Sequence, residues 1–459
     1  MQGVWMFRWR SFVLLFAGWA FFCAQASAQV LLRDAEIEEW LYDMSEPLWQ
    51  VAGLPDGSVE ILLIGDPTPN AFAGASSGLK MGIHTGLITL ADTPNEVEGV
   101  IAHETGHLAG GHSARTAEAM AKASKPRLLG LMVGAALLAA GAPAGAGLTA
   151  MGLGQAAALD TYLGYSRGQE SAADQAGLTY LDEVGSSARG LLDFFDVLKN
   201  QQLIRANQPQ PYFQTHPLAV QRVARLRNRA EASPYWDERD SPEEIAKLRL
   251  IQAKIHGFLN DPNVTLRMYP LTDQSDAARY ARAVAYYRSS DLPAAMREID
   301  RLLADYPDNP YYYELKGQML FEHGKAADAI APHRTSAELA PQHALLKINL
   351  ARALVATDRD ENVAEAIGIL EEALRLERDN GFAWAVLARA RSHQGDDTLA
   401  LLAQAEAEYH SNDPVAAHRF ASLAKDKLTV GTPEHQQALD IIVATAEIAQ
   451  QARRQPRRR

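Results

Sequence analysis

The C-terminal part of the chain, from residue 273 to about residue 450, repeats apolar positions with the period of an amphipathic helix, almost without a break. Within it, small residues recur every 34 residues, and the first two of them are each followed by an alanine 12 residues later and a proline 24 residues later. The markers are Ala283, Gly317 and Ala351, then Ala295 and Ala329, then Pro307 and Pro341. This period predicts tetratricopeptide repeats, helix hairpins that bury their apolar faces by stacking. At least four units fit, and Ala416 to Gln451 could add a last pair or cap; the alternative is an irregular helical bundle.

An apolar run near the N-terminus has the layout of a secretory signal peptide. Arg8 and Arg10 precede the apolar run Ser11 to Cys23, and Ala26-Ser27-Ala28 follows as a small-residue cleavage site. The run is shorter than the ~20 residues that span a bilayer. The sequence therefore predicts cleavage before Gln29, and the alternative is an uncleaved membrane anchor.

A second apolar stretch, Leu128 to Leu159, has no charged residue. Pro143 and several glycines interrupt it, so neither half reaches ~20 residues. We expect a hairpin of Ala- and Gly-rich helices that covers the site described next, with possible contact to a membrane interface rather than a span.

The segment Thr93 to Glu96 predicts a helix start, with Thr93 as cap, a proline at the first helical position and Glu96 completing a capping box. The helix continues through a His-Glu-Thr-Gly-His motif. His103 and His107 are four residues apart, so both imidazoles can bind one zinc ion. Glu104 is rotated about 100° from His103 and can act as general base and then general acid. The alternative is a pair of surface histidines.

A hydrolytic zinc site needs three protein ligands and one open position. Some zinc peptidases place a third histidine six residues after the second one, but here that position is Ser113. His112 is one residue too early, so we expect it to support a ligand rather than to bind the metal. Glu170 and Asp174 lie four apart on another expected helix, so one can bind zinc while the other orients a ligating histidine. On spacing alone they could instead be a solvated acidic pair.

Composition limits the classes of partner and the types of metal ligand that we expect. The chain has 459 residues, 47% of them hydrophobic and 22% charged, and its formal net charge is −12. This acidic balance argues against nucleic acid as a partner. Cys23, the single cysteine, lies in the predicted signal, so any metal in the mature chain must be held by His, Asp or Glu.

Taken together, these motifs resemble the zinc peptidase family that includes the CAAX prenyl proteases and the membrane protease HtpX. The family pattern of HExxH followed by ExxAD is met here by His103 to His107 and by Glu170 to Asp174. Asn70-Ala71-Phe72-Ala73, an extended-looking stretch from Met81 to Leu90, and Thr215-His216-Pro217 with Arg222 also match. The resemblance covers residues from about 35 to 230. We expect an exposed edge of the Met81–Leu90 stretch to pair with substrate backbone.

The resemblance implies one zinc ion per chain, with Glu170 as third ligand and Asp174 as its supporting carboxylate. The signal peptide and the repeats resemble the periplasmic, BepA-like branch of the family, in which the histidine matching His216 can be a fourth ligand that keeps the enzyme latent. That branch implies a periplasmic endopeptidase that acts on misassembled outer-membrane β-barrel proteins and contacts their assembly machinery through the repeats. It also implies a chaperone activity that aids assembly.

The expected fold is mainly α, a zincin-type metallopeptidase domain of helices with a small sheet, followed by an α-solenoid. The expected segments are 1–28 signal peptide, 29–235 peptidase, 236–272 helical connector, 273–451 repeats and 452–459 basic tail. Two alternatives stay open. One is a latent or non-catalytic repeat scaffold that serves as an assembly factor, and the other is a membrane-anchored protease of the HtpX type.

Overall fold

The computed structural model describes residues 30–75, 78–113, 115, 124–125, 128–129, 131–133, 144–204, 212, 216 and 220–454. The expected signal peptide, residues 1–28, lies outside the described residues, as do Pro143, Thr215, Pro217 and residues 455–459 of the expected tail. Within the described residues, no helix is long and apolar enough to cross a membrane.

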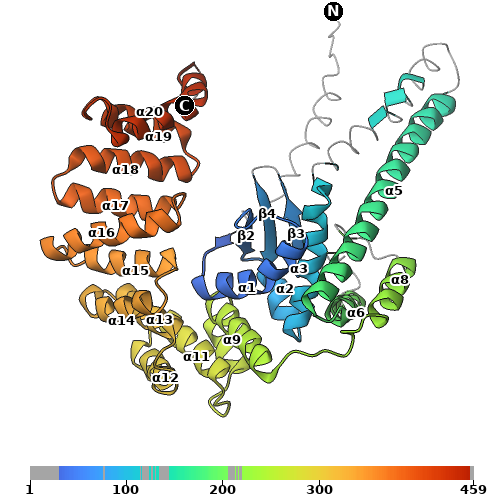
Figure 1. Ribbon diagram of the computed structural model, residues 1–459, viewed down its shortest axis with the longest axis horizontal. Helices are drawn as coiled ribbons and strands as arrows, with labels where there is room; N and C mark the ends of the chain where they lie inside the picture. Colours follow the sequence, from blue (N-terminus) through green and yellow to red (C-terminus); the bar gives the residue numbers. More distant parts are fainter. Residues whose placement is uncertain are drawn as a thin grey trace, which may run out of the picture.

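The N-terminal half combines a small sheet with helices (Figure 1). The sheet has the order β1-β2-β4-β3, and β2 and β4 are parallel while the outer pairings are antiparallel. Apolar side chains of α1, the sheet, α3 and α6 share one core. The elements are β1 (Leu31–Leu32), α1 (Ala35–Val51), β2 (Val59–Ile64), β3 (Ala71–Gly74), β4 (Leu79–His84), α2 (Thr85–Leu90), α3 (Pro94–Ala109), α5 (Ala144–Val184), α6 (Arg189–Ile204) and α8 (Val220–Glu231).

The expectation of one extended, edge-exposed stretch from Met81 to Leu90 is wrong. Only β4 is extended, and it lies between β2 and β3, so β3 forms the edge of the sheet on that side. The second half of the stretch is helix α2, whose start is fixed by hydrogen bonds from Gly86 N and Thr85 Oγ1 to the carbonyl of Asp66. A short apolar run without charges does not distinguish strand from helix by its pattern.

The connector holds two helices, α9 (Pro242–Leu259) and α10 (Pro262–Met268). The start of α9 carries a capping box, in which Ser241 and Glu244 bond to each other's backbone N–H groups. Leu248 and Ile251 of α9 join the core of the N-terminal half, while the same helix packs against α11 (Asp276–Arg288). The connector therefore joins the two halves as a packed element rather than as a free linker.

Helix hairpins fill the rest of the chain and stack in sequence order (Figure 1). The marker residues Ala283, Ala295, Ala329 and Ala351 are fully buried, as small residues at helix crossings should be. Helix α16 has 17 residues where α12 and α14 have 14, so the third hairpin is longer than the first two. The hairpins are α11 (Asp276–Arg288) with α12 (Leu292–Asp305), α13 (Pro310–Glu322) with α14 (Ala326–Leu339), α15 (Ala344–Val355) with α16 (Asp360–Leu376), α17 (Gly381–His393) with α18 (Asp397–His410), and α19 (Pro414–Lys425) with α20 (Pro433–Arg454).

Candidate metal centre

Helix α3 carries the His-Glu-Thr-Gly-His motif in the middle of the N-terminal half, buried on nearly every side. The helix starts where expected, with Pro94 at its first turn, but Thr93 makes no side-chain capping bond. The Glu96 carboxylate accepts instead from the backbone N–H of Asp92, at 2.9 Å. The capping box is therefore incomplete and shifted by one residue, and burial of the helix supplies the stability that the cap does not.

Helix α5 brings the second acidic motif to the first. Glycines let α3 and α5 approach closely: a Cβ on Gly106 would lie 2.6 Å from the carbonyl oxygen of Ala173, and one on Gly177 would lie 3.0 Å from the Ala102 backbone. At this separation Glu170 reaches across to the α3 histidines. Both Glu170 and Asp174 are buried, so the interpretation as a solvated acidic pair is wrong.

Four potential ligands converge on one point: His103, His107, Glu170 and His216, whose ligand atoms all lie within 4.8 Å of one another. The two Nε2 atoms of His103 and His107 are 3.1 Å apart, and Glu170 carboxylate oxygens lie 3.5 and 3.3 Å from them. Nδ1 of His216 lies 3.3 Å from His103 Nε2 and 3.2 Å from Glu170 Oε2.

These separations fit a metal ion. A tetrahedral zinc ion with bonds of about 2.0–2.1 Å separates its ligand atoms by about 3.3 Å. Nitrogen and carboxylate oxygen are also donors that zinc prefers, and the four groups have no thiolate among them. The cluster formed by His103, His107, Glu170 and His216 can therefore hold a divalent metal ion.

A layer of charged groups surrounds these four residues. Asp174 lies 3.0 Å from Nδ1 of His103, which leaves Nε2 of that ring facing the cluster. Arg222, on α8, contacts both oxygens of Asp174 at 2.6 and 2.7 Å and Glu170 at 2.9 Å. The sequence marked Arg222 only through the family resemblance, because nothing in the spacing of residues 174 and 222 predicts a contact.

Two further rings support the histidines. Nδ1 of His112 lies 2.9 Å from Nδ1 of His107, so His112 orients a potential ligand rather than joining the cluster. The buried Tyr212 ring stacks on His216, with centroids 4.7 Å apart. Sequence reasoning missed Tyr212, since a single aromatic residue four positions before a histidine carries no specific signal.

The electrostatics favour a cation at the centre. Burial alone would lower the pKa of His103, but Asp174 and Glu170 outweigh it and raise this pKa to about 9. Burial alone would raise the pKa of Glu170, but His103, His107 and His216 hold it well below its usual range. The ionised carboxylates thus stabilise positive charge among the imidazoles.

Glu104 is the remaining acid of the motif. Its carboxylate is 1% exposed, and Oε1 lies 3.4 Å from Nε2 of His216. It therefore borders the cluster without belonging to it, as its place one residue after His103 predicts. In the described part of the chain, the histidines of the repeats form no comparable metal-binding group.

Comparisons with known proteins agree with this geometry. Residues 35–230 match the family model described as Peptidase family M48. A putative beta-barrel assembly-enhancing protease of Vibrio cholerae is 26% identical over 390 residues, covering 82% of this chain and 77% of the relative. The beta-barrel assembly-enhancing protease of Escherichia coli K12 is 26% identical over 384 residues, covering 82% and 76%. Metalloprotease YcaL of the same organism is 31% identical over 160 residues, covering 35% and 58%. Residues 35–230 of this mainly helical chain are thus a metallopeptidase domain of peptidase family M48, followed by tetratricopeptide repeats.

Proposed function

We propose that this chain is a periplasmic zinc endopeptidase that acts on outer-membrane β-barrel proteins during their assembly. The observation that carries the catalytic part is the convergence of three imidazoles and one carboxylate at the ligand spacing of a tetrahedral ion. The relatives named beta-barrel assembly-enhancing proteases support the biological part, because their similarity extends over 82% of the chain.

In this proposal His103, His107 and Glu170 hold one zinc ion, and Glu104 moves protons. When bound, zinc supplies Lewis acidity at the scissile carbonyl and lowers the pKa of the attacking water. The Glu104 carboxylate takes a proton from that water and delivers it to the leaving amine. Asp174 keeps the ring of His103 in the tautomer that presents Nε2, and Arg222 keeps Asp174 ionised in a buried position.

His216 would act as a removable fourth ligand. It contacts both Glu170 and the proton-transferring Glu104, so it fills the position that water and substrate need. Stacking on Tyr212 holds the ring in place. We therefore propose a latent resting state, from which His216 departs before substrate enters.

The remaining assignments concern where and on what the enzyme acts. The segment 1–28 would direct the chain to the periplasm, and the repeats would bind polypeptide substrates and the assembly machinery, since stacked repeats present extended binding surfaces. A chaperone contribution to barrel assembly belongs to the same proposal.

Proteolysis of an unfolded outer-membrane barrel protein, by the chain from residue 29 onward, tests the function. Wild type should cleave it, and Glu104→Gln should lose about 10²–10⁴-fold of the rate, the range that a general base contributes. A soluble unfolded protein such as casein is the comparison substrate. Equal activity of wild type and Glu104→Gln would show that Glu104 is not the base.

The latent state has its own test. His216→Ala should cleave faster than wild type, and His435→Ala, which changes a histidine of the last helix, α20, should leave the rate unchanged. A rate that falls in His216→Ala would instead make His216 a permanent ligand.

The contacts of His216 also support one of the alternative functions. With His216 against Glu104 and Glu170, the chain could serve as a latent repeat scaffold that assists assembly without cleavage. Loss of function in Glu104→Gln, measured as barrel-assembly yield, separates the two, because a scaffold does not need that carboxylate. The membrane-anchored alternative is tested by sequencing the N-terminus of the mature protein, which should begin at Gln29.

A further inference from the structure

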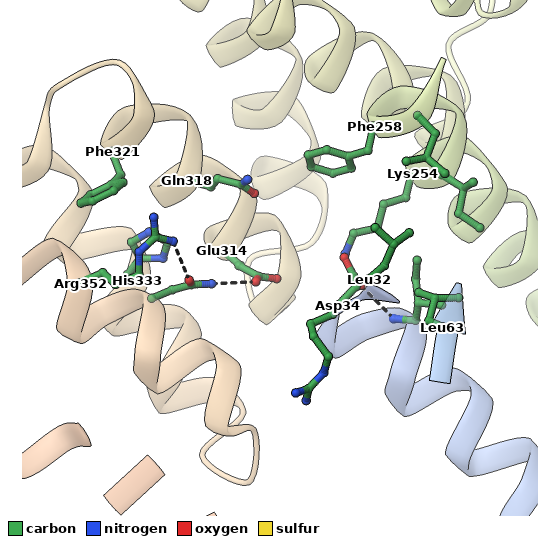
Figure 2. A pocket seen from close by; sticks show the side chains of 15 residues that line it. Leu32, Asp34, Leu63, Lys254, Phe258, Glu314, Gln318, Phe321, His333 and Arg352 are labelled. Carbon is green, nitrogen blue, oxygen red and sulfur yellow. Dashed lines mark hydrogen bonds and ion pairs between the residues drawn. The ribbon is translucent and has the colours of Figure 1, made fainter. Parts of the chain in front are cut away.

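A cavity of about 440 Å³ lies between the N-terminal half, α9, and helices α13, α14 and α15 of the repeats, and its volume is well within the size range of ligand pockets. None of its lining residues belongs to the metal cluster. Figure 2 shows Phe321, His333 and Arg352 on the repeat side, and Leu32 and Phe258 on the opposite side. The cavity thus has walls from both halves of the chain.

Arg352 is the unusual group in this cavity. Its guanidinium lies over the rings of Phe321 and Phe382, at 4.8 and 5.2 Å, and 3.5 Å from the amide oxygen of Asn349. Among the residues that the structure describes, no carboxylate lies within ion-pair distance of it. Glu322, whose charge acts on Arg352, already accepts hydrogen bonds from Tyr287 and Gln318. A half-buried cation without a counter-ion favours an anionic ligand.

His333 lines the cavity together with Arg352. Its side chain is 3% exposed, and its ring packs against Gly317, where an added Cβ would lie 2.6 Å from Nδ1. Burial, and then the charge of Arg352, lower its pKa to about 4, so the ring is neutral. The positive charge in this part of the cavity therefore belongs to Arg352 alone.

The other charged groups of the cavity have partners within the chain, and Arg33 pairs with Glu38 at 2.8 Å and Glu377 at 3.0 Å. Lys254 is paired with Asp34 at 2.8 Å and Glu36 at 3.2 Å, so it is not available to a ligand. Glu314 accepts a hydrogen bond from Asn349 at 3.0 Å, and burial raises its pKa to about 7. At neutral pH Glu314 is therefore only partly charged, and it can accept a backbone N–H from a bound peptide.

Other parts of the cavity wall are apolar and are formed by Leu32, Phe258 and Phe321. The matching ligand needs a carboxylate and an apolar side chain on one residue, which is the chemistry of a polypeptide C-terminus. We propose that the cavity binds the apolar C-terminal residue of a polypeptide, with its α-carboxylate against Arg352 and its side chain against the apolar wall.

This inference rests on the proposed protein-binding role of the repeats, but its test needs no proteolysis. The chain from residue 29, carrying Glu104→Gln to prevent cleavage, is titrated into a short fluorescein-labelled peptide that ends in Phe, and anisotropy is measured. The free acid should bind at least about tenfold more tightly than the C-terminal amide, because a hydrogen bond to a charged group is lost. A carboxylate on an acidic side chain could also contact Arg352. An amidated peptide with an internal Glu tests this source, and it should bind as weakly as the C-terminal amide without Glu.

Arg352→Leu should weaken binding of the acid at least about tenfold, and Arg352→Lys, which keeps the charge, should weaken it less. Arg389→Leu is the matched control, since Arg389 follows the buried Ala388 of α17 as Arg352 follows the buried Ala351 of α15, and Arg389 is exposed. Thermal unfolding shows whether each variant is folded. If Arg352→Leu does not fold, the test compares wild type with Arg352→Lys. Equal binding of acid and amide, no binding by wild type, or full binding by Arg352→Leu would overturn the proposal.

Discussion

Buried charges around the cluster are arranged so that each carboxylate has a cationic or imidazole partner. Asp174 contacts His103 on one side and Arg222 on the other, which lets an ionised aspartate remain at 1% exposure. Removing one member of such a set leaves the others uncompensated in a medium of low dielectric constant. The supporting residues should therefore matter for metal affinity as well as for stability.

Asp174→Asn tests this expectation. The amide can still contact Arg222 but no longer stabilises the His103 ring by charge, so affinity for zinc should fall by about 10–100-fold. Competition with a chromophoric chelator measures it. Asp182→Asn is the control, because Asp182 is on the same helix but pairs with Arg229 and Ser233. Unchanged zinc affinity in Asp174→Asn would show that the carboxylate has only a packing role.

Glu96 predicts a pH dependence of stability. Burial raises its pKa from 4.5 to about 7, with the charges of nearby aspartates adding to the effect. Between these values the folded chain holds a proton that the unfolded chain has released, so the free energy of unfolding should fall as pH rises from about 4.5 to about 7.

In Glu96→Gln, which keeps the hydrogen bond from Asp92, this fall should be smaller. Urea unfolding in the presence of a chelator, at several pH values across the window, measures it. Parallel pH profiles for wild type and Glu96→Gln would contradict the assignment.

At this scale the sequence predicts part of the site. The local spacing of His103, Glu104 and His107 within one helix is sufficient to place them together, whereas spacing alone does not distinguish Glu170 from Asp174 as the ligand, and only the family resemblance favours Glu170. Tyr212 and Arg222 could not be assigned contacts in this way. Their contacts join segments that are distant in the sequence, and such contacts depend on how the helices pack.

At the scale of elements, the crossing of α3 and α5 sets the distance between the two halves of the cluster. Gly106 faces the backbone of Ala173, and no side chain fits there. The sequence predicts both helices from their apolar pattern but not their separation, since that depends on which small residues face each other. The helical second half of Met81 to Leu90 could not be predicted for a similar reason, because tertiary contacts of Gly86 decide its conformation.

Gly106→Ala should therefore push the helices apart. We expect a loss of about 1–3 kcal/mol in the free energy of unfolding, as for other overpacked cores, together with weaker zinc binding. Gly168→Ala is the matched control on α5, where an added Cβ meets no atom within 4 Å. It should stabilise by about 0.5–1 kcal/mol, because alanine favours helix. Equal effects of the two substitutions would contradict the close-packing account.

At the scale of the whole molecule, the N-terminal half and the repeats are joined by buried polar contacts. Lys254 on α9 contacts Asp34 and Glu36 near the start of α1, and Tyr311 of the repeats donates to Glu39 at 2.5 Å. The 34-residue period predicts the solenoid, but no pattern in the sequence predicts these pairings. They hold α9 and α13 against the start of α1.

Lys254→Met tests this junction. It leaves the fully buried Glu36 with Lys247 as its remaining cation, so the free energy of unfolding should fall by about 3–5 kcal/mol, as when a buried pair loses one partner. Lys347→Met, which removes a surface pair with Glu372, should change it by less than about 1 kcal/mol. Similar losses in both variants would show that the junction contributes no more than a surface contact.

The central claim is that His103, His107 and Glu170 hold one zinc ion. The most direct measurement is metal content by inductively coupled plasma mass spectrometry on the purified chain from residue 29, after exposure to zinc and removal of the excess. Wild type and Glu104→Gln should each retain about one zinc per chain, as one set of ligands requires, and Glu170→Gln should retain far less. Absence of zinc from wild type, or equal retention in Glu170→Gln, would contradict the account.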